Sequence, residues 1–399
     1  MALFRKSSKT EPTIKRAGAK DYNKLTAAQR AITLYAEDGG SWPHLEPIIS
    51  ELTQRQGRTI CYLTSDDNDP VFSRTVNGLL PFSIGDGVGR SFLFQMMETG
   101  VMLATVPQLG LKVLPRSRNA ARLGTQYVYV FHSMASTHMI YEPDGFDHYD
   151  TVLVVGPYME REIRARELQA QLPPKELIAH GYGRLDSIIA ANAARVTPQS
   201  DAPAPTVVLI APSWGPHCIF ETCGNELVRV LLDAGFEVIA RPHPMTAKRT
   251  PEALVRLESA FRDHPRFLLE RDISSQESLH RCDVMVSDWS GAALEYAFGR
   301  ERPVLFIDVP RKVNNPLYGE LGIEPFEASI RSEIGAIVAP HALDKAAQIV
   351  NDLVANPHSF SAQIRQVRDA NIHNVTTSAK IAADIIGAKA DAYLARITA

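Results

Sequence analysis

The residues best suited to chemistry follow a short apolar run in the second half of the chain. Residues 284–299 pass from this run through a polar turn into a helix that starts with small residues. Ser290 can cap that helix, and Gly291 lies in its first turn. Backbone N–H groups and the helix dipole at such a start favour an anion, so we expect a phosphate to bind here. Ser287 adds a hydroxyl, whereas Asp288 is expected to orient the loop, because a carboxylate beside bound phosphates would repel them.

A second candidate group is the sequence R-P-H-P at residues 241–244. Prolines on both sides of His243 favour extended backbone and therefore fix the direction of the imidazole. A rigid His243 beside Arg241 at the end of a strand suits the neutralisation of a leaving phosphate. The alternative is that both side chains only support the strand end. Two strand ends with anion-binding residues indicate a site for a nucleotide diphosphate donor.

Two further donor-site candidates lie near these segments. Ser213 and Trp214 follow an apolar strand, where the hydroxyl could donate to a phosphate and the indole could pack on a base. Glu295 lies roughly one and a half turns into the helix that starts at Ser290, and it could reach ribose hydroxyls. The alternatives are a plain turn with a half-buried tryptophan and an ordinary surface carboxylate.

The first half of the chain contributes a candidate base. The sequence V-F-H-S at residues 130–133 places His132 at the end of a buried strand, before a hydroxyl-rich turn. A neutral histidine there could take the proton of an acceptor hydroxyl, because its ordinary pKa is close to the working pH. The alternative is a core or capping histidine, and His138 is a second, weaker candidate base.

Apolar, strand-like runs alternate with helical stretches along the chain, which is typical of βαβ units and parallel sheets. We therefore predict an α/β fold of two Rossmann-like, doubly wound domains that face each other across a cleft. The expected parts are a basic N-terminal arm (1–30), an acceptor domain (31–195), a proline-rich linker (196–206), a nucleotide-donor domain (207–375) and a C-terminal helix (376–399). The last 40 residues, from about 361 to 398, are predicted to form Ala-rich helix. The predicted strands are residues 58–64, 101–106, 126–133, 151–156, 176–182, 206–212, 236–242, 266–270, 284–288 and 303–308.

The composition excludes several classes of function. A length of 399 residues suits two domains, and a formal net charge of −3 gives no case for nucleic-acid binding. Cys218 and Cys223 could form half of a zinc site with His217, but no second pair completes it, so we expect no metal and no other cofactor. Scattered cysteines and an N-terminus without an apolar leader predict a cytoplasmic protein. The most apolar stretch, residues 92–114, is predicted to be a helix and a buried strand, because charged residues and proline interrupt it.

The first 30 residues are strongly basic, with eight Lys and Arg against Glu11 and Asp21. Such an arm could hold the protein on the anionic inner face of the plasma membrane, at roughly 1 kcal/mol per well-placed cation. The alternative is a solvated leader without a partner.

Taken together, these motifs resemble the CDP-glycerol glycerophosphotransferase family, which includes the teichoic-acid glycerol-phosphate primases and polymerases. The matching sequences are A-P-S-W, R-P-H-P, S-D-W-S-G-A-A-L-E-Y and G-R-E-R-P-V-L-F-I-D, in the order of the family and over about residues 200–310. The sequence F-H-S at residues 131–133 falls where the family has an H-G motif. The resemblance implies a glycosyltransferase-B (GT-B) type fold and transfer of glycerol phosphate from CDP-glycerol to an acceptor hydroxyl, with release of CMP.

The resemblance also implies a role for individual residues. His132 would match the acceptor-side base of the family, and His243 its phosphate-side histidine. The loop that holds the donor would be matched by Ser287, Ser290 and Gly291. Folds of this type work without a bound metal.

The sequence departs from the family at the site itself. Trp289 stands where the family usually has Tyr, and Gly291 replaces a second Ser, which removes one hydroxyl. Ser133 and Met134 follow His132, where the Gram-positive polymerases have Gly and a downstream Lys. We therefore predict transfer of a polyol phosphate from a CDP-activated donor to a cell-envelope or capsular glycan, free or lipid-linked. The alternatives are an NDP-sugar-dependent GT-B glycosyltransferase of surface polysaccharide synthesis and a non-catalytic, glycan-binding or scaffold member.

Overall fold

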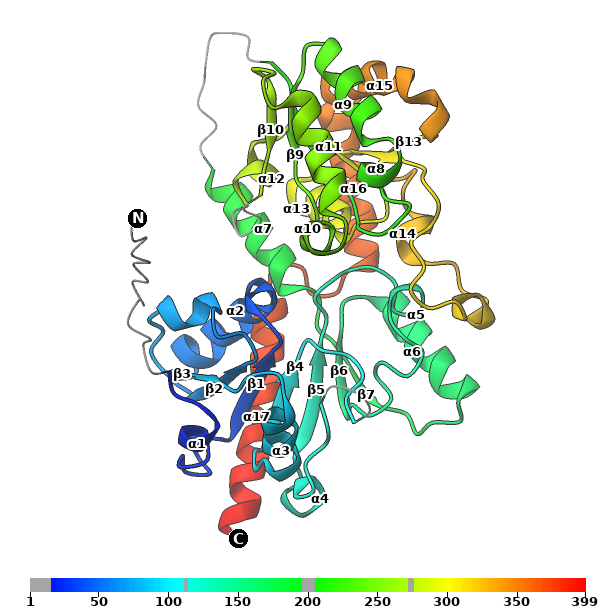
Figure 1. Ribbon diagram of the computed structural model, residues 1–399. Coiled ribbons are helices and arrows are strands. Elements are labelled where there is room, and N and C mark those ends of the chain that lie inside the picture. The colour runs from blue at the N-terminus through cyan, green and yellow to red at the C-terminus, as the bar shows by residue number, and fades with distance from the viewer. Residues whose placement is uncertain (1–15, 111–113, 196–204, 272–275) are drawn as a thin grey trace, which may run out of the picture.

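The computed structural model describes residues 16–110, 114–195, 205–271 and 276–399 (Figure 1). These residues form two α/β domains, each built on one parallel sheet with helices packed against it. The predicted fold class of two Rossmann-like domains is therefore confirmed. Most of the predicted linker, up to residue 204, lies outside the described residues.

The first sheet has seven strands in the order β3-β2-β1-β4-β5-β6-β7, and all neighbouring strands are parallel. Its strands are β1 (Ile32–Ala36), β2 (Ile60–Thr64), β3 (Leu79–Ser83), β4 (Val101–Ala104), β5 (Gln126–Val130), β6 (Thr151–Val154) and β7 (Glu176–Ala179). Its α-helices are α1 (Ala19–Tyr22), α2 (Trp42–Ser50), α3 (Val88–Met96), α4 (Ala120–Leu123), α5 (Thr137–Ile140), α6 (Pro157–Gln169) and α7 (Gly183–Ala194). The strand order reverses between β1 and β4, the point where doubly wound sheets bind their ligands.

The second sheet has six parallel strands in the order β10-β9-β8-β11-β12-β13. Its strands are β8 (Val207–Ile210), β9 (Glu237–Ala240), β10 (Phe267–Leu269), β11 (Val284–Ser287), β12 (Val304–Ile307) and β13 (Gly335–Val338). Its α-helices are α8 (Ile219–Thr222), α9 (Gly224–Asp233), α10 (Pro244–Arg249), α11 (Pro251–Phe261), α12 (Glu277–Arg281), α13 (Gly291–Arg300), α14 (Phe326–Ser329), α15 (Ala346–Ala355) and α16 (Pro357–Asn371). Here the order reverses between β8 and β11, so α13 starts at this switch point.

The central strands read as continuous apolar runs because helices cover both faces of each sheet. Every residue of β1, β2, β4, β6, β11 and β12 is buried. The ten predicted strands all occur, each shortened by one to three residues at its ends. We did not predict β1, β3 and β13. Of these, β3 and β13 lie at the edges of their sheets and are only partly buried, and β3 contains Pro81.

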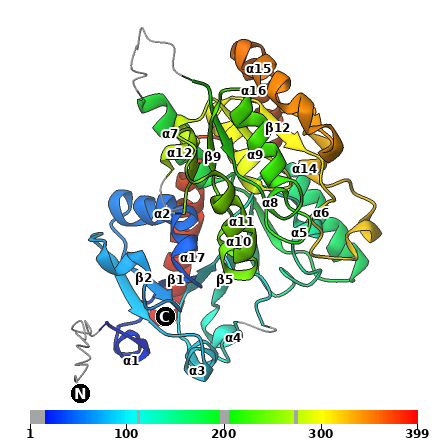
Figure 2. The ribbon, with the colours of Figure 1, turned by 45° about the horizontal axis from the view of Figure 1, so that its top comes forward.

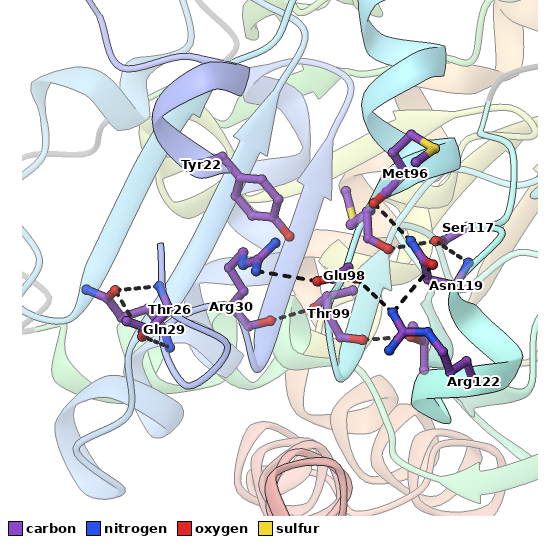
Figure 3. A network of polar contacts seen from close by, with 12 residues as sticks. Tyr22, Thr26, Gln29, Arg30, Met96, Glu98, Thr99, Ser117, Asn119 and Arg122 are labelled. Atoms are coloured by element: carbon purple, nitrogen blue, oxygen red, sulfur yellow. Dashed lines mark hydrogen bonds and ion pairs between the residues drawn. The ribbon is translucent and has the colours of Figure 1, made fainter. Parts of the chain in front are cut away.

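Residues 16–30, the second half of the predicted basic arm, are folded onto the first domain. Tyr22 is fully buried, with its ring 5.8 Å from that of Phe82 in an edge-on contact. Arg30 lies 3.8 Å from the carboxylate of Glu98 and belongs to a polar network beside β4 (Figure 3). Only residues 1–15 of the predicted arm therefore lie outside the described fold.

The C-terminal residues form two helices, where the sequence predicted one continuous helical stretch. Residues between α16 and α17 (Ser378–Thr398) interrupt the helix, and Asn374 and Thr376 adopt left-handed backbone with φ of 47° and 72°. After this break α17 returns to the first domain, where it packs on α2 and β4 (Figures 1 and 2). The end of the chain thus crosses back from the second domain to the first.

Candidate active site

His132 lies just beyond the carboxyl end of β5 and close to the second domain. Its ring forms a hydrogen bond with the backbone of Thr105, and the carboxylate of Glu295 in α13 is near enough to influence its pKa. The side chain is open to solvent, yet the surrounding protein removes enough water that burial lowers its pKa. His132 is therefore a neutral imidazole at pH 7, which is the form that can accept a proton.

His243 follows β9 and caps α10 with its own ring. Its Nδ1 accepts a hydrogen bond from the backbone N–H of Met245 at 3.1 Å. Burial, together with the charges of Lys312 and His132, lowers the pKa of His243 to about 3. The neutral ring therefore carries its single proton on Nε2, where it can donate to a phosphate oxygen. Because His132 acts on this pKa, the two predicted histidines come together from different domains.

The start of α13 lies against the first domain at this site. Ser290 is the N-cap, and its Oγ accepts the N–H of Ala292 at 3.3 Å. A Cβ atom on Gly291 would lie 2.7 Å from Oγ of Ser133, which follows His132. The predicted anion-binding helix start and the predicted base are therefore neighbours.

Three buried side chains hold the loops of the site in place, namely Ser287, Asp288 and Ser213. Ser287 is fully buried and donates to the carbonyl of Ala211 at 2.7 Å. Asp288 accepts the backbone N–H groups of Ser213 and Trp289, each at 2.6 Å, as the predicted loop-orienting role requires. Burial raises the pKa of Asp288, and the hydrogen bonds from these N–H groups offset only part of this rise. Ser213 is itself only 4% exposed, so these three side chains hold loops in place and do not face open solvent.

Arg241 does not turn toward the helix start as we predicted. Its Nη1 donates to Oγ of Ser278 at 2.7 Å and lies 3.2 Å from a carboxylate oxygen of Glu270. Glu270 follows β10, and Ser278 lies in α12, so these two partners belong to the same domain as Arg241.

Glu295 joins the two domains. Its Oε1 accepts the hydroxyl hydrogen of Tyr182 at 2.9 Å, and its Oε2 accepts from Nε of Arg184 at 2.8 Å. Both partners belong to the start of α7, and the Glu295 side chain is only 10% exposed. Its two oxygens are therefore engaged by the first domain, whereas we predicted that they would face a ribose.

Lys312 is a cation of the site that sequence reasoning missed. Its Nζ lies 4.3 Å from the ring centre of Trp214, and the Arg249 guanidinium lies 4.7 Å from the same ring. Burial lowers the pKa of Lys312 to about 8, and its charge acts on His243. Lys312 follows β12 by a few residues, so the strand-end rule that found His132 and His243 would also have found it. The Trp214 ring thus contacts two cations and also lies against the His243 ring.

His44 is a second residue that we missed. It lies in the first turn of α2, just after β1, and its ring centre is 6.1 Å from that of His132. Tyr182 hydrogen-bonds its Nδ1 at 3.1 Å. The signal that could have found it is the position of a histidine after the first strand at the switch point, but β1 was not predicted.

His138, the weaker candidate base, lies away from His132 in a cavity of about 120 Å³ beside α5 and α6. Its Nδ1 is 3.3 Å from Glu162, and its Nε2 is 2.9 Å from the carbonyl of Ile323. Both ring nitrogens therefore lie close to an oxygen atom, and the contact with Ile323 joins α5 to the second domain.

The side chains and helix start at this site include positive charge and N–H donors. Among the described residues, no group of three or more His, Cys, Asp and Glu side chains is arranged to hold a metal ion. Burial raises the pKa of Cys218 to about 11 and also raises that of Cys223. The groups suited to an anion are Lys312, Nε2–H of His243 and the start of α13.

Comparison with solved structures establishes the fold. A variant of the wall teichoic acid polymerase TagF superposes with a TM-score of 0.60 at 12% identity, over 94% of each chain. The UDP-GlcNAc 2-epimerase of Neisseria meningitidis, bound to UDP-GlcNAc, gives 0.58 at 12% identity, over 90% of this chain and 99% of that one. S. aureus MnaA with UDP gives 0.55 at 11% identity, over 92% and 97%. The chain therefore has the two-domain GT-B architecture along nearly its whole described length.

Sequence comparison adds no family to this result. No protein-family model matches the chain, and no curated protein sequence matches it.

Proposed function

We propose that the chain is a transferase that moves a glycerol-phosphate or related polyol-phosphate unit from a CDP-activated donor to a hydroxyl of a cell-envelope or capsular glycan. The observation that carries the proposal is the pair His132 and His243. Both are neutral imidazoles, they come from different domains, and His132 is close enough to contribute to the lowered pKa of His243. His243 presents an N–H donor, whereas His132 is suited to accept a proton.

In the proposed reaction, the acceptor hydroxyl attacks the β-phosphorus of the donor in line. A new O–P bond forms while the bond from the β-phosphorus to the bridging oxygen breaks, and CMP leaves with the electron pair. His132 takes the hydroxyl proton. Nε2–H of His243, the Lys312 ammonium and the start of α13 neutralise the charge on the leaving phosphate. Such a step depends mainly on positioning and electrostatics.

Motif and fold support the same proposal independently. The motifs A-P-S-W, R-P-H-P and S-D-W-S-G occupy the ends of β8, β9 and β11, which meet at one edge of the second sheet. One of the similar structures is a wall teichoic acid polymerase.

A thermal-shift screen tests the proposal. The ligands are CDP-glycerol, CDP-ribitol, CMP, CDP, UDP and a panel of UDP- and GDP-sugars. A ligand at 100 times its dissociation constant adds about 2.7 kcal/mol to the free energy of unfolding, which is a readable shift. Selective stabilisation by cytidine nucleotides, followed by CMP release from CDP-glycerol, is the expected result. Stabilisation by uridine or guanosine nucleotides alone would overturn it.

The second candidate is an NDP-sugar-dependent glycosyltransferase. It is favoured by the fold shared with proteins solved with UDP-GlcNAc and with UDP. In that case attack would occur at an anomeric carbon, and a UDP- or GDP-sugar would stabilise the protein. The same screen therefore separates the two.

We also propose that the enzyme works at an anionic membrane surface. Residues 1–15 carry four Lys and Arg against one Glu. They join the fold beside β3, where Ser83 donates its N–H to the carbonyl of Ala17 at 2.9 Å. The nearby helix α3 exposes an apolar stripe of Val88, Phe92 and Met96, which are 88%, 66% and 47% exposed. A basic segment and an exposed apolar stripe are both features that favour binding to the interface of an anionic bilayer. None of the described helices has the length and hydropathy of a membrane span.

A further inference from the structure

Four side chains form a hydrogen-bonded chain that crosses the boundary between the domains and ends at His44. Arg184 donates from Nε to Oε2 of Glu295 at 2.8 Å. The hydroxyl of Tyr182 donates to Oε1 of the same carboxylate at 2.9 Å. The hydroxyl oxygen of Tyr182 lies 3.1 Å from Nδ1 of His44.

The proton positions along this chain follow from the groups themselves. The Glu295 carboxylate is paired with Arg184 and can only accept hydrogen bonds. Tyr182 has one hydroxyl hydrogen, which it gives to Glu295. The contact between the Tyr182 oxygen and Nδ1 of His44 is therefore a hydrogen bond only if Nδ1 carries a proton. Burial, Arg184 and His132 lower the pKa of His44 well below its ordinary value, so the ring is neutral.

A neutral ring with its proton on Nδ1 has a lone pair on Nε2. None of the described residues hydrogen-bonds to Nε2 of His44. This atom is also not fully buried, so it is open to a hydroxyl from outside the protein. The ring stands edge-on to that of His132, with the centres 6.1 Å apart and the planes at 67°. The lone pair is thus available beside the proposed base.

We propose that His44 is a further acceptor-binding residue, whose Nε2 accepts a hydrogen bond from an acceptor hydroxyl next to the one that His132 deprotonates. Tyr182 and Glu295 are its positioning residues, because they fix the tautomer. The inference rests on the proposed function for the identity of the acceptor as a hydroxyl compound. It predicts an acceptor with neighbouring hydroxyls, as in a polyol. Because Glu295 belongs to the donor domain, the acceptor site is complete only when the two domains are in contact.

The tautomer can be measured without any activity. In the full chain labelled with ¹⁵N-histidine, NMR of the ring nitrogens is expected to show His44 neutral, with its proton on Nδ1. The signal is assigned from its loss in His44→Asn. Tyr182→Phe removes the hydroxyl alone, and it is expected to abolish the preference for Nδ1–H. Tyr149→Phe, which removes another buried hydroxyl of the same domain, should leave the His44 signal unchanged. A proton on Nε2 of His44 in the unaltered chain would overturn the inference.

The role of His44 is tested with CDP-glycerol as donor probe and glycerol as acceptor probe. Asn at residue 44 places a donor near the position of Nδ1 only, whereas Gln places an acceptor oxygen near the position of Nε2. His44→Asn is expected to lower glycerol-dependent CMP release about tenfold more than it lowers hydrolysis by water, the value of one good hydrogen bond. His44→Gln should recover most of the glycerol-dependent rate. Equal loss of both rates in both variants would show a merely structural residue.

Failure of this inference can be told from failure of the proposed function. If the unaltered protein releases no CMP from CDP-glycerol, the proposed function fails, while the NMR measurement still decides the His44 tautomer. If CMP is released and His44→Asn responds to glycerol as the unaltered protein does, only the inference fails.

Discussion

Gly291 and Ser133 face each other across the domain boundary, since a Cβ atom on Gly291 would lie 2.7 Å from Oγ of Ser133. The Ser133 hydroxyl of the first domain therefore lies against the helix start of the second. Gly291 has no side chain, and this leaves room for that hydroxyl.

Gly291→Ser is expected to lower CMP release from CDP-glycerol about fivefold to tenfold. The new Cβ displaces the Ser133 hydroxyl, which loses its hydrogen bond from the N–H of Ala135, a change of about 1 kcal/mol. The double variant Gly291→Ser/Ser133→Gly removes the clash and keeps one hydroxyl at this place, so it should regain most of the rate. A single variant as active as the unaltered enzyme would contradict this account.

Lys312→Gln is expected to weaken the binding of CMP about tenfold, because a cation next to the leaving phosphate is lost. The pKa of Lys312 is lowered to about 8, so its positive charge is present below that pH and is lost as the pH rises through it. Affinity for CMP should therefore fall between about pH 7 and 9, well below the titration of an ordinary lysine. Titration calorimetry across this range measures it. Arg311→Ala, at an exposed neighbour paired with Glu324, is the control and should bind CMP normally.

His243→Asn separates the chemistry of His243 from its structural role. Asparagine is a good N-cap, so it should preserve α10 and the melting temperature while it removes the Nε2–H donor. Turnover is expected to fall about 100-fold. His132→Ala should give a loss of similar size, because the base is removed. Near-normal turnover in both variants would rule out the proposed mechanism.

The sequence predicted the parts of the fold that depend on local pattern. Apolar runs gave the buried strands, and polar residues at their carboxyl ends gave His132, His243 and the start of α13. These positions lie near one another because parallel strands bring their carboxyl ends to one edge wherever they lie in the sequence. Edge strand β3 contains Pro81, which argues against a strand in a sequence pattern, so it was not predicted.

The partners of charged side chains could not be predicted in this way. Arg241 suited a phosphate by type and position, but it donates to the Glu270 carboxylate and the Ser278 hydroxyl, 29 and 37 residues away. Glu295 is engaged in the same manner by Tyr182 and Arg184. Such pairing depends on how helices and loops pack, which is tertiary information.

The ion pair of His138 and Glu162 should make stability depend on pH. Burial alone would lower the pKa of His138, but the hydrogen bond and charge of Glu162 outweigh it and raise the pKa above 6.5. A raised pKa in the folded state stabilises the protein below about pH 6.5, and this contribution is lost as the pH rises through the folded value. Melting temperatures of the unaltered protein relative to His138→Gln are therefore expected to decline from pH 6 to 8. Parallel profiles of the two proteins would show that His138 does not titrate in this way.

The α3 stripe and the basic segment should act together at a membrane. Phe92→Ser/Met96→Ser and deletion of residues 1–15 are each expected to lower co-sedimentation with phosphatidylglycerol-containing vesicles several-fold, because one removes apolar insertion and the other removes cations. Leu168→Ser is the matched control, since Leu168 is 81% exposed on α6 and has no part in the stripe. Binding of the unaltered chain should weaken with salt and be absent with phosphatidylcholine alone, because exposed charges are screened and need an anionic surface. If the α3 variant sediments normally while its mass in light scattering halves, the stripe joins two copies of the chain and does not insert into lipid.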